Sequence, residues 1–116
     1  MLCFNAKPGF VTEYDLRKEG ECITYKLSSK EEVTAVAISP SQRDLVLGQN
    51  DGVVRIFDLA SNRDPNSAWN ESSTISAFTN VNGRKGGVSR LKFHPNTRAL
   101  FAASTVGCVK LLRLGL

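Results

Sequence analysis

The chain has 116 residues, of which 41% are hydrophobic and 22% charged, and its formal net charge is +4. This length is typical of one domain. The sequence contains no run of about 18 apolar residues, so we expect no transmembrane helix. The N-terminus, Met1 to Phe4, lacks the basic and apolar regions of a secretory signal peptide. Cys3, Cys22 and Cys108 are odd in number and scattered, so we expect small buried thiols in an intracellular protein rather than disulfides or metal ligands.

Ten β-strands are predicted in chain order, because apolar and β-branched runs alternate with clusters of Gly, Pro, Asn and Asp. The runs are Met1–Asn5, Phe10–Leu16, Cys22–Leu27, Val33–Ser39, Asp44–Gly48, Val53–Leu59, Thr74–Thr79, Val88–Phe93, Ala99–Ala103 and Cys108–Leu114. The longest connection, Ala60–Ser73, is polar and contains one proline. This pattern predicts an all-β, antiparallel domain.

Residues 33–59 recur as residues 88–114, at a constant offset of 55 positions. The identical pairs are Val33/Val88, Pro40/Pro95, Arg43/Arg98, Leu45/Leu100, Gly52/Gly107, Val54/Val109 and Leu59/Leu114. Each proline ends a strand because it has no N–H to give to a ladder. The sequence Asn50-Asp51-Gly52 favours a hairpin turn, since these residues tolerate positive φ. Self-similarity at a fixed spacing indicates a repeat architecture.

A shorter third copy lies upstream, where Gly9–Leu16 matches Gly52–Leu59 at an offset of 43. A glycine, a valine, an aspartate and a leucine are identical, and Tyr14 corresponds to Phe57. Residues 1–5 could supply the preceding strand, with residues 6–8 as its turn. The chain therefore contains two full copies of the unit and part of a third.

These residues resemble the WD repeat of β-propellers. Tyr14-Asp15 and Phe57-Asp58 fit the aromatic-Asp ending of the family's unit, and Ser39-Pro40 and His94-Pro95 fit the pair after its first strand. The offset of 43 lies within the ~40–45-residue period of such units. The resemblance implies an incomplete propeller of antiparallel four-stranded blades. It also implies structural turn or repeat roles for Asp15, Pro40, Asp51, Gly52, Phe57, Asp58, Pro95 and Gly107.

The chain departs from this family at its buried Trp–Ser–His–Asp hydrogen-bond network. The Gly-His pair before the first strand is replaced by Ser28-Ser29 in one copy and by Gly83-Arg84 in the other. The turn aspartate, kept as Asp51, becomes Val106 in the last copy. We therefore expect the network to be incomplete in both full copies, and the blades to depend more on packing.

Ten strands amount to about two and a half blades, whereas closed propellers have about 4–8. We expect a partial WD-repeat propeller over residues 1–116. Its parts are a partial blade with an outer strand at 1–30, the first clear repeat at 31–60, a long connection with an outer strand at 61–87 and the last repeat at 88–116. The strand order favours the C-terminal end of a propeller, whose other blades come from a missing part of the chain or from self-association.

Function is expected in the loops, because core demands fill the strands. Arg84 and Lys85 lie in a glycine-flanked loop, and we take them as candidate partner-binding residues together with Lys30, Asn50 and Arg98. Trp69, the only large apolar residue of the long connection, is a further candidate because Trp is enriched among binding anchors. The alternative is that Trp69 folds back to cover the blade.

Charge is divided unevenly, with a net −2 in residues 1–60 and a net +6 in residues 61–116. A basic half can mark contact with RNA or an acidic protein. Arg90, Lys92 and Lys110 nevertheless alternate with apolar residues along strands, which favours a solvated strand face.

Catalysis finds little support in the sequence. His94 is the only histidine, and no nucleophile elbow, phosphate loop or metal-ligand spacing is present. We expect no enzyme activity, cofactor or metal. The favoured function is a non-catalytic scaffold that docks protein partners in a larger cytoplasmic or nuclear complex, without membrane contact. The alternatives are a scaffold associated with RNA or ribonucleoprotein, and a non-catalytic part of a larger enzyme complex.

Overall fold

The structure, a computed structural model, describes residues 2–15, 17, 22–62, 67–95 and 99–113. Each of the ten strands predicted from the sequence is present, and a 3-10 turn, η1 (Leu59–Ser61), follows β6. The strands are β1 (Leu2–Lys7), β2 (Phe10–Asp15), β3 (Cys22–Lys26), β4 (Val33–Ile38), β5 (Asp44–Gln49), β6 (Val53–Asp58), β7 (Ser73–Ser76), β8 (Val88–Phe93), β9 (Ala99–Ser104) and β10 (Val109–Arg113).

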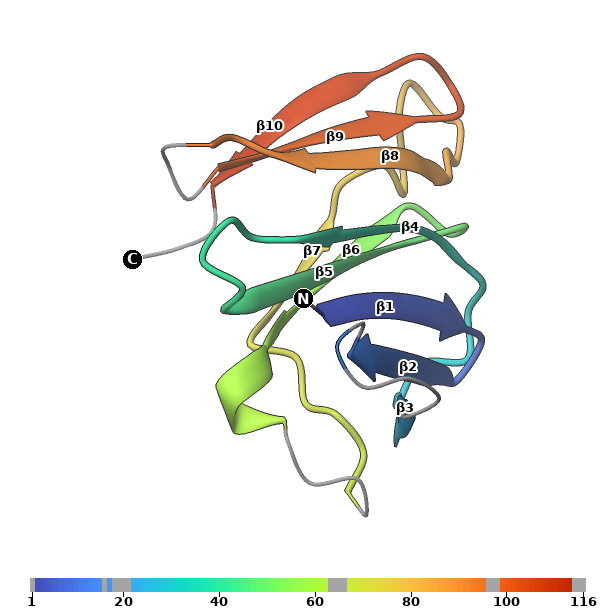
Figure 1. The fold of residues 1–116 in the computed structure, drawn as a ribbon. Coiled ribbons are helices and arrows are strands. Elements are labelled where there is room, and N and C mark those ends of the chain that lie inside the picture. Colours follow the sequence, from blue (N-terminus) through green and yellow to red (C-terminus); the bar gives the residue numbers. More distant parts are fainter. Residues whose placement is uncertain (1, 16, 18–21, 63–66, 96–98, 114–116) are drawn as a thin grey trace.

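The strands form three antiparallel sheets. The first sheet has the order β1-β2-β3, the central sheet β4-β5-β6-β7 and the last sheet β10-β9-β8. Figure 1 shows the central sheet between the other two, with β4 beside β8 and β1 beside β4. The central sheet is a four-stranded antiparallel blade, and the two three-stranded sheets are incomplete blades. The predicted fold class is therefore confirmed.

Two hydrophobic clusters hold the sheets together. Side chains alternate between the faces of a strand, and the central sheet is covered on both faces, so β5 is buried along its whole length. The cluster between the first and central sheets consists of Val11, Tyr25, Leu27, Leu45, Leu47, Phe57, Leu59 and Trp69. The cluster between the central and last sheets consists of Val46, Val54, Ile56, Ala77, Phe78, Val88, Leu100 and Ala102.

Trp69 lies in the first of these clusters and is 1% exposed. Its ring packs on Tyr25 and Phe57, with centroids 4.9 and 5.3 Å apart. Its backbone N–H donates to the carbonyl oxygen of Lys26 at 2.8 Å, which ties the long connection to the end of β3. The hypothesis of Trp69 as a partner anchor is therefore corrected, because the ring is occupied within the chain and covers the blade.

The turns are built by the residues to which the WD-repeat resemblance gave structural roles. Gly52 has φ +87°, and a Cβ there would lie 2.6 Å from the carbonyl oxygen of Gly86, so the position demands glycine. The Asp51 carboxylate accepts the Val53 N–H at 3.1 Å, and the Asp58 carboxylate caps η1 by accepting the Ala60 N–H at 3.3 Å.

Phe57, a further residue of that set, lies within β6 and packs in the core, and the other four lie at turns or at strand ends. Gly107 has φ +83°, and Pro40 and Pro95 each lie two residues beyond a strand end. Asp15 accepts the backbone N–H of Arg17 at 3.0 Å, and this hydrogen bond lowers the pKa of its carboxyl group.

Most strand boundaries agree with the prediction to within one residue, and two strand ends differ by more. β1 continues through Lys7, so its turn is Pro8-Gly9 instead of residues 6–8. β7 ends at Ser76, whereas the sequence predicted a strand to Thr79. The reason is that Phe78 leaves the ladder, enters the core and donates its N–H to the Gly52 carbonyl at 3.0 Å.

Candidate partner-binding site

Five connections gather at one end of the three sheets, because antiparallel strands place every second connection at the same end. We call residues 8–9, 27–32, 50–52, 77–87 and 105–108 the loop row. Backbone hydrogen bonds join its members. The donor–acceptor pairs are Leu27 to Gly9 (2.8 Å), Asn50 to Glu32 (2.9 Å), Phe78 to Gly52 (3.0 Å) and Thr105 to Gly87 (2.9 Å). The loop row is therefore one connected surface on a packed support.

A small hairpin projects from the loop row. Val81 and Arg84 close it through reciprocal backbone hydrogen bonds of 2.7 and 3.0 Å. Its tip, Asn82 and Gly83, has φ values of 52° and 80°, and an added Cβ on Gly83 would meet nothing within 4 Å. Arg84 and Lys85 are both exposed. The hairpin thus exposes two cations, and its own backbone hydrogen bonds hold its conformation.

The other candidate residues lie along the same row. The Asn50 side-chain oxygen would be 3.1 Å from a Cβ on Gly87, so Asn50 adjoins the base of the hairpin. Lys30 adjoins the β1–β2 turn at Gly9, and both Lys30 and Asn50 are exposed. The structure therefore brings four of the candidates to one end. Arg98 lies outside the described residues.

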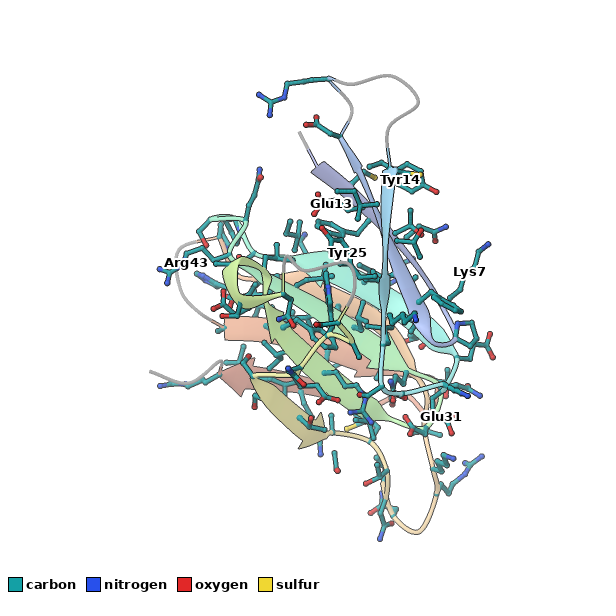
Figure 2. The ribbon with its side chains drawn as sticks, turned by 90° about the horizontal axis from the view of Figure 1, so that it is seen from below. Lys7, Glu13, Tyr14, Tyr25, Glu31 and Arg43 are labelled. Atoms are coloured by element: carbon teal, nitrogen blue, oxygen red, sulfur yellow. The ribbon has the colours of Figure 1, made fainter. Side chains whose placement is uncertain are left out.

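Acidic residues accompany the cations of the loop row. Glu31 and Glu32 follow Lys30 directly and are exposed. Figure 2 shows Lys7 and Glu31 at one end of the sheets and Arg43 at the other. This end of the sheets therefore carries charges of both signs, which weakens the binding of a polyanion.

The cations of the C-terminal half point in different directions. Arg90 and Lys92 are exposed on the face of the last sheet that is turned away from the central sheet. Lys110 lies on the opposite face, where its Nζ donates to the Ala77 carbonyl at 2.6 Å and sits 5.6 Å from the centre of the Phe78 ring. The prediction that Lys110 shares one face with Arg90 and Lys92 is wrong, because Lys110, although exposed, lies on the face that is turned toward the central sheet.

A polar network that the sequence did not predict lies beneath the loop row. Gln49 is 1% exposed, and both ends of its amide are satisfied when the oxygen accepts from Arg55 Nε (2.9 Å) and Ser29 Oγ (3.0 Å). The amide nitrogen then donates to Asp51 Oδ1 at 3.2 Å. Arg55 also forms an ion pair with Glu71.

This network includes two of the positions at which the sequence was compared with the WD repeat. Ser29 takes the position of the missing histidine, and Asp51 is the turn aspartate that both share. Pattern matching could not find it, because its glutamine and arginine are not the residues of the family's network. The central blade therefore combines packing with a polar network of its own.

The described residues offer little for catalysis or metal binding. Among the residues that the structure describes, no group of three His, Cys, Asp or Glu residues lies close enough to hold a metal ion. Cys3 and Cys22 are exposed, which corrects the expectation that they are buried; Cys108 is partly buried. Cys3 and Cys22 pair with Tyr14 from its two sides, so they lie two strand spacings of ~4.8 Å apart, beyond the ~7 Å limit for a disulfide.

A cavity of about 210 Å³ lies beside η1 and the connection that follows it. Its lining is Ser61, Asn62, Ser67, Ala68, Trp69 and Asn70. None of these described side chains is an acid or base that titrates near neutral pH. Within the described ranges, no helix is long and apolar enough to span a bilayer.

Comparison with known proteins bears on the arrangement of the sheets. No protein-family model and no curated protein sequence matches the chain. Raptor from Chaetomium thermophilum is 20% identical over 99% of the chain, with a TM-score of 0.73. The computationally designed Ika4 protein is 18% identical over 97% of the chain, with a TM-score of 0.58. The chain has a β-propeller-like fold. It spans 10% of that Raptor chain and 64% of the designed chain, and at these identities the likeness concerns the fold alone.

Proposed function

We propose that the chain is a segment of a WD-repeat propeller and acts as a non-catalytic scaffold that docks protein partners in a larger intracellular complex. The observation that carries this proposal is the loop row. It brings exposed Lys30, Asn50, Arg84 and Lys85 to one end of a packed β support. Binding residues concentrate on loops that a rigid scaffold positions. The fold by itself does not supply this function.

Mixed charge supports a protein partner over RNA. Nucleic-acid binding needs several cations that follow a phosphate backbone. Here Glu31 and Glu32 lie beside Lys30, and Arg90 and Lys110 occupy opposite faces of the last sheet. A partner surface with its own mixture of charges and hydrogen-bonding groups matches this end better.

Charge reversal on the hairpin tests the proposal. The tagged chain, its Arg84→Glu/Lys85→Glu variant and an Arg43→Glu control are compared in quantitative pull-downs from cells. Arg43 is exposed at the opposite end of the sheets, so its reversal tests for non-specific charge effects. We expect partners of the wild-type chain to persist with the control and to fall at least about tenfold with the hairpin variant, as for loss of a binding hot spot.

Equal recovery by all three proteins would refute docking at the loop row. RNA recovered in place of protein, with an affinity that falls steeply with salt, would favour the nucleic-acid alternative.

A further inference from the structure

The central sheet has a face on which the last sheet packs. On it lie Val46, Val54 and Ile56, none more than 4% exposed. The offset of 55 assigns counterparts to all three on the last sheet. These counterparts are Phe101, Val109 and Leu111, with exposed fractions of 43%, 67% and 53%. We call these three residues the open face of the last sheet. The equivalent face of the central sheet packs against another sheet, whereas no described residue packs on this one.

The first sheet is open on the side turned away from the central sheet. Phe10 and Tyr14 lie there on β2, 47% and 39% exposed. Cys3 and Cys22 flank Tyr14 on the neighbouring strands. Tyr14 holds the position that Phe57 holds on the central sheet, where Phe57 packs against the first sheet. This open face of the first sheet therefore corresponds to a surface that is buried one repeat later.

We propose that the open face of the last sheet binds the open face of the first sheet of a second copy of this chain. The same kind of contact occurs twice within the chain, between the first and central sheets and between the central and last sheets. In each case, two different faces of the repeated sheet meet. A head-to-tail pair of copies covers both open faces of both copies at once. This inference goes beyond the proposed function and does not depend on it.

The number of sheets favours two copies. One chain has three sheets, so two copies have six, which lies within the range of about 4–8 blades over which such rings close. Three copies would have nine sheets and lie outside it. A heterologous contact that closes after two copies gives a discrete dimer, whereas one that does not close gives a filament.

Two cations on β8 favour the three-stranded first sheet of a second copy over a four-stranded sheet as the partner of the open face of the last sheet. Arg90 and Lys92 take the positions of Ala35 and Ala37, which on β4 pack beneath β8. A four-stranded covering sheet would bury these cations under its innermost strand, and burial of unpaired charge is costly. In the described part of the first sheet, β1 is the edge strand and corresponds to β5, so no strand lies inward of it. A second copy therefore leaves Arg90 and Lys92 in water.

Sedimentation velocity of the 116-residue chain is the test. We expect a species with twice the 12.7 kDa mass of the chain. Leu111→Lys and Phe10→Lys alter the two open faces separately, and both side chains are about half exposed within one chain, so the fold survives. Each variant should raise the dimer dissociation constant at least about tenfold, as expected when a buried apolar side chain is replaced by a charge.

A matched control and a mixing experiment complete the design. Ile23→Lys changes a 44% exposed residue on β3 that points to the other face of the first sheet, so it should leave the dimer intact. Equimolar Leu111→Lys and Phe10→Lys should regain part of the association, because their mixed pair keeps one intact contact. Circular dichroism checks that each variant is folded.

The thiols provide a second readout. Cys3 and Cys22 should react with maleimide more slowly in the wild-type dimer than in Leu111→Lys, while Cys108 should react equally in both. A wild-type chain that remains monomeric at high micromolar concentration would overturn the proposal. So would dissociation by Leu111→Lys but not by Phe10→Lys, since that result would mean contact between two last sheets. The hairpin variant Arg84→Glu/Lys85→Glu should still dimerise, so failure of partner docking and failure of dimerisation are distinguishable.

Discussion

The central and last sheets come from the same repeat, yet the central sheet buries both faces and the last sheet only one. Where β5 carries Gly48, pressed by Val88 from the last sheet, β9 carries Ala103. Where the central sheet holds the Gln49–Arg55 network, the last sheet has Ser104 and Lys110. The sequences of two copies of one backbone unit have therefore diverged according to what packs against each copy.

The largest expected difference between the two sheets concerns an equivalent pair of apolar residues. Ile56→Ala should lower the free energy of unfolding by about 2–4 kcal/mol, because it leaves a cavity in the core. Leu111→Ala should change it by only about 0.5 kcal/mol, because Leu111 is exposed. Urea titrations check this, with both changes made in a Phe10→Lys background to keep the chain monomeric. Similar losses at the two positions would mean that the two sheets do not differ in the burial of this face.

A glycine and its counterpart give the next contrast. A Cβ on Gly48 would lie 2.4 Å from Val88 Cγ1, so Gly48→Ala should destabilise the chain by about 1–3 kcal/mol through overpacking. The reverse change, Ala103→Gly, should reduce stability by only about 0.5–1 kcal/mol through backbone entropy. Thermal and urea unfolding measure both. A neutral Gly48→Ala would mean that β8 does not press on β5.

The polar network of the central sheet predicts a loss of similar or smaller size. Gln49→Leu removes the amide that satisfies Arg55, Asp51 and Ser29, and should reduce stability by about 1–3 kcal/mol. Ser104→Ala, the equivalent change on the last sheet, removes one acceptor for the Cys108 N–H and should reduce it by about 1 kcal/mol. If Ser104→Ala proves the more destabilising, the Gln49 network contributes no more to stability than a single hydrogen bond of the last sheet.

The smallest expected effect concerns Lys110. Lys110→Met keeps an unbranched chain near Phe78 but removes the hydrogen bond to the Ala77 carbonyl, so we expect a loss of about 0.5–1.5 kcal/mol. Lys92→Met, on the solvated side of β8, serves as control and should be within about 0.5 kcal/mol of wild type. Equal effects would show that the orientation of Lys110 contributes nothing.

Most of the fold could be predicted from the sequence because the repeat shows the spacing of the strands, and because the turns contain residues that favour turn conformations. Gly52 and Asp51 marked a hairpin that has the expected conformation. The packing partners of long or polar side chains could not be predicted, because they depend on neighbouring sheets. Trp69 packs on Tyr25, and Lys110 donates to the Ala77 carbonyl, both groups that are distant in sequence.

The candidate site could be predicted in part. Glycines around Arg84 indicated an exposed loop, and its closure by Val81 follows from a turn whose two central residues have positive φ. The hydrogen bonds that join separate loops into one row could not be predicted, since they link residues of different repeats. Whether Lys30, Asn50, Arg84 and Lys85 bind a partner stays a prediction.

The last sheet repeats the central sheet but lacks a cover within one chain, and amide hydrogen exchange can measure this difference directly. In monomeric Phe10→Lys, amides of β6, which is paired on both sides, should be protected at least about tenfold more than those of the edge strand β10. In the wild-type dimer, the protection of β10 should rise while that of β6 changes little. Equal protection of β6 and β10 in the monomer, or no gain at β10 on association, would contradict the account.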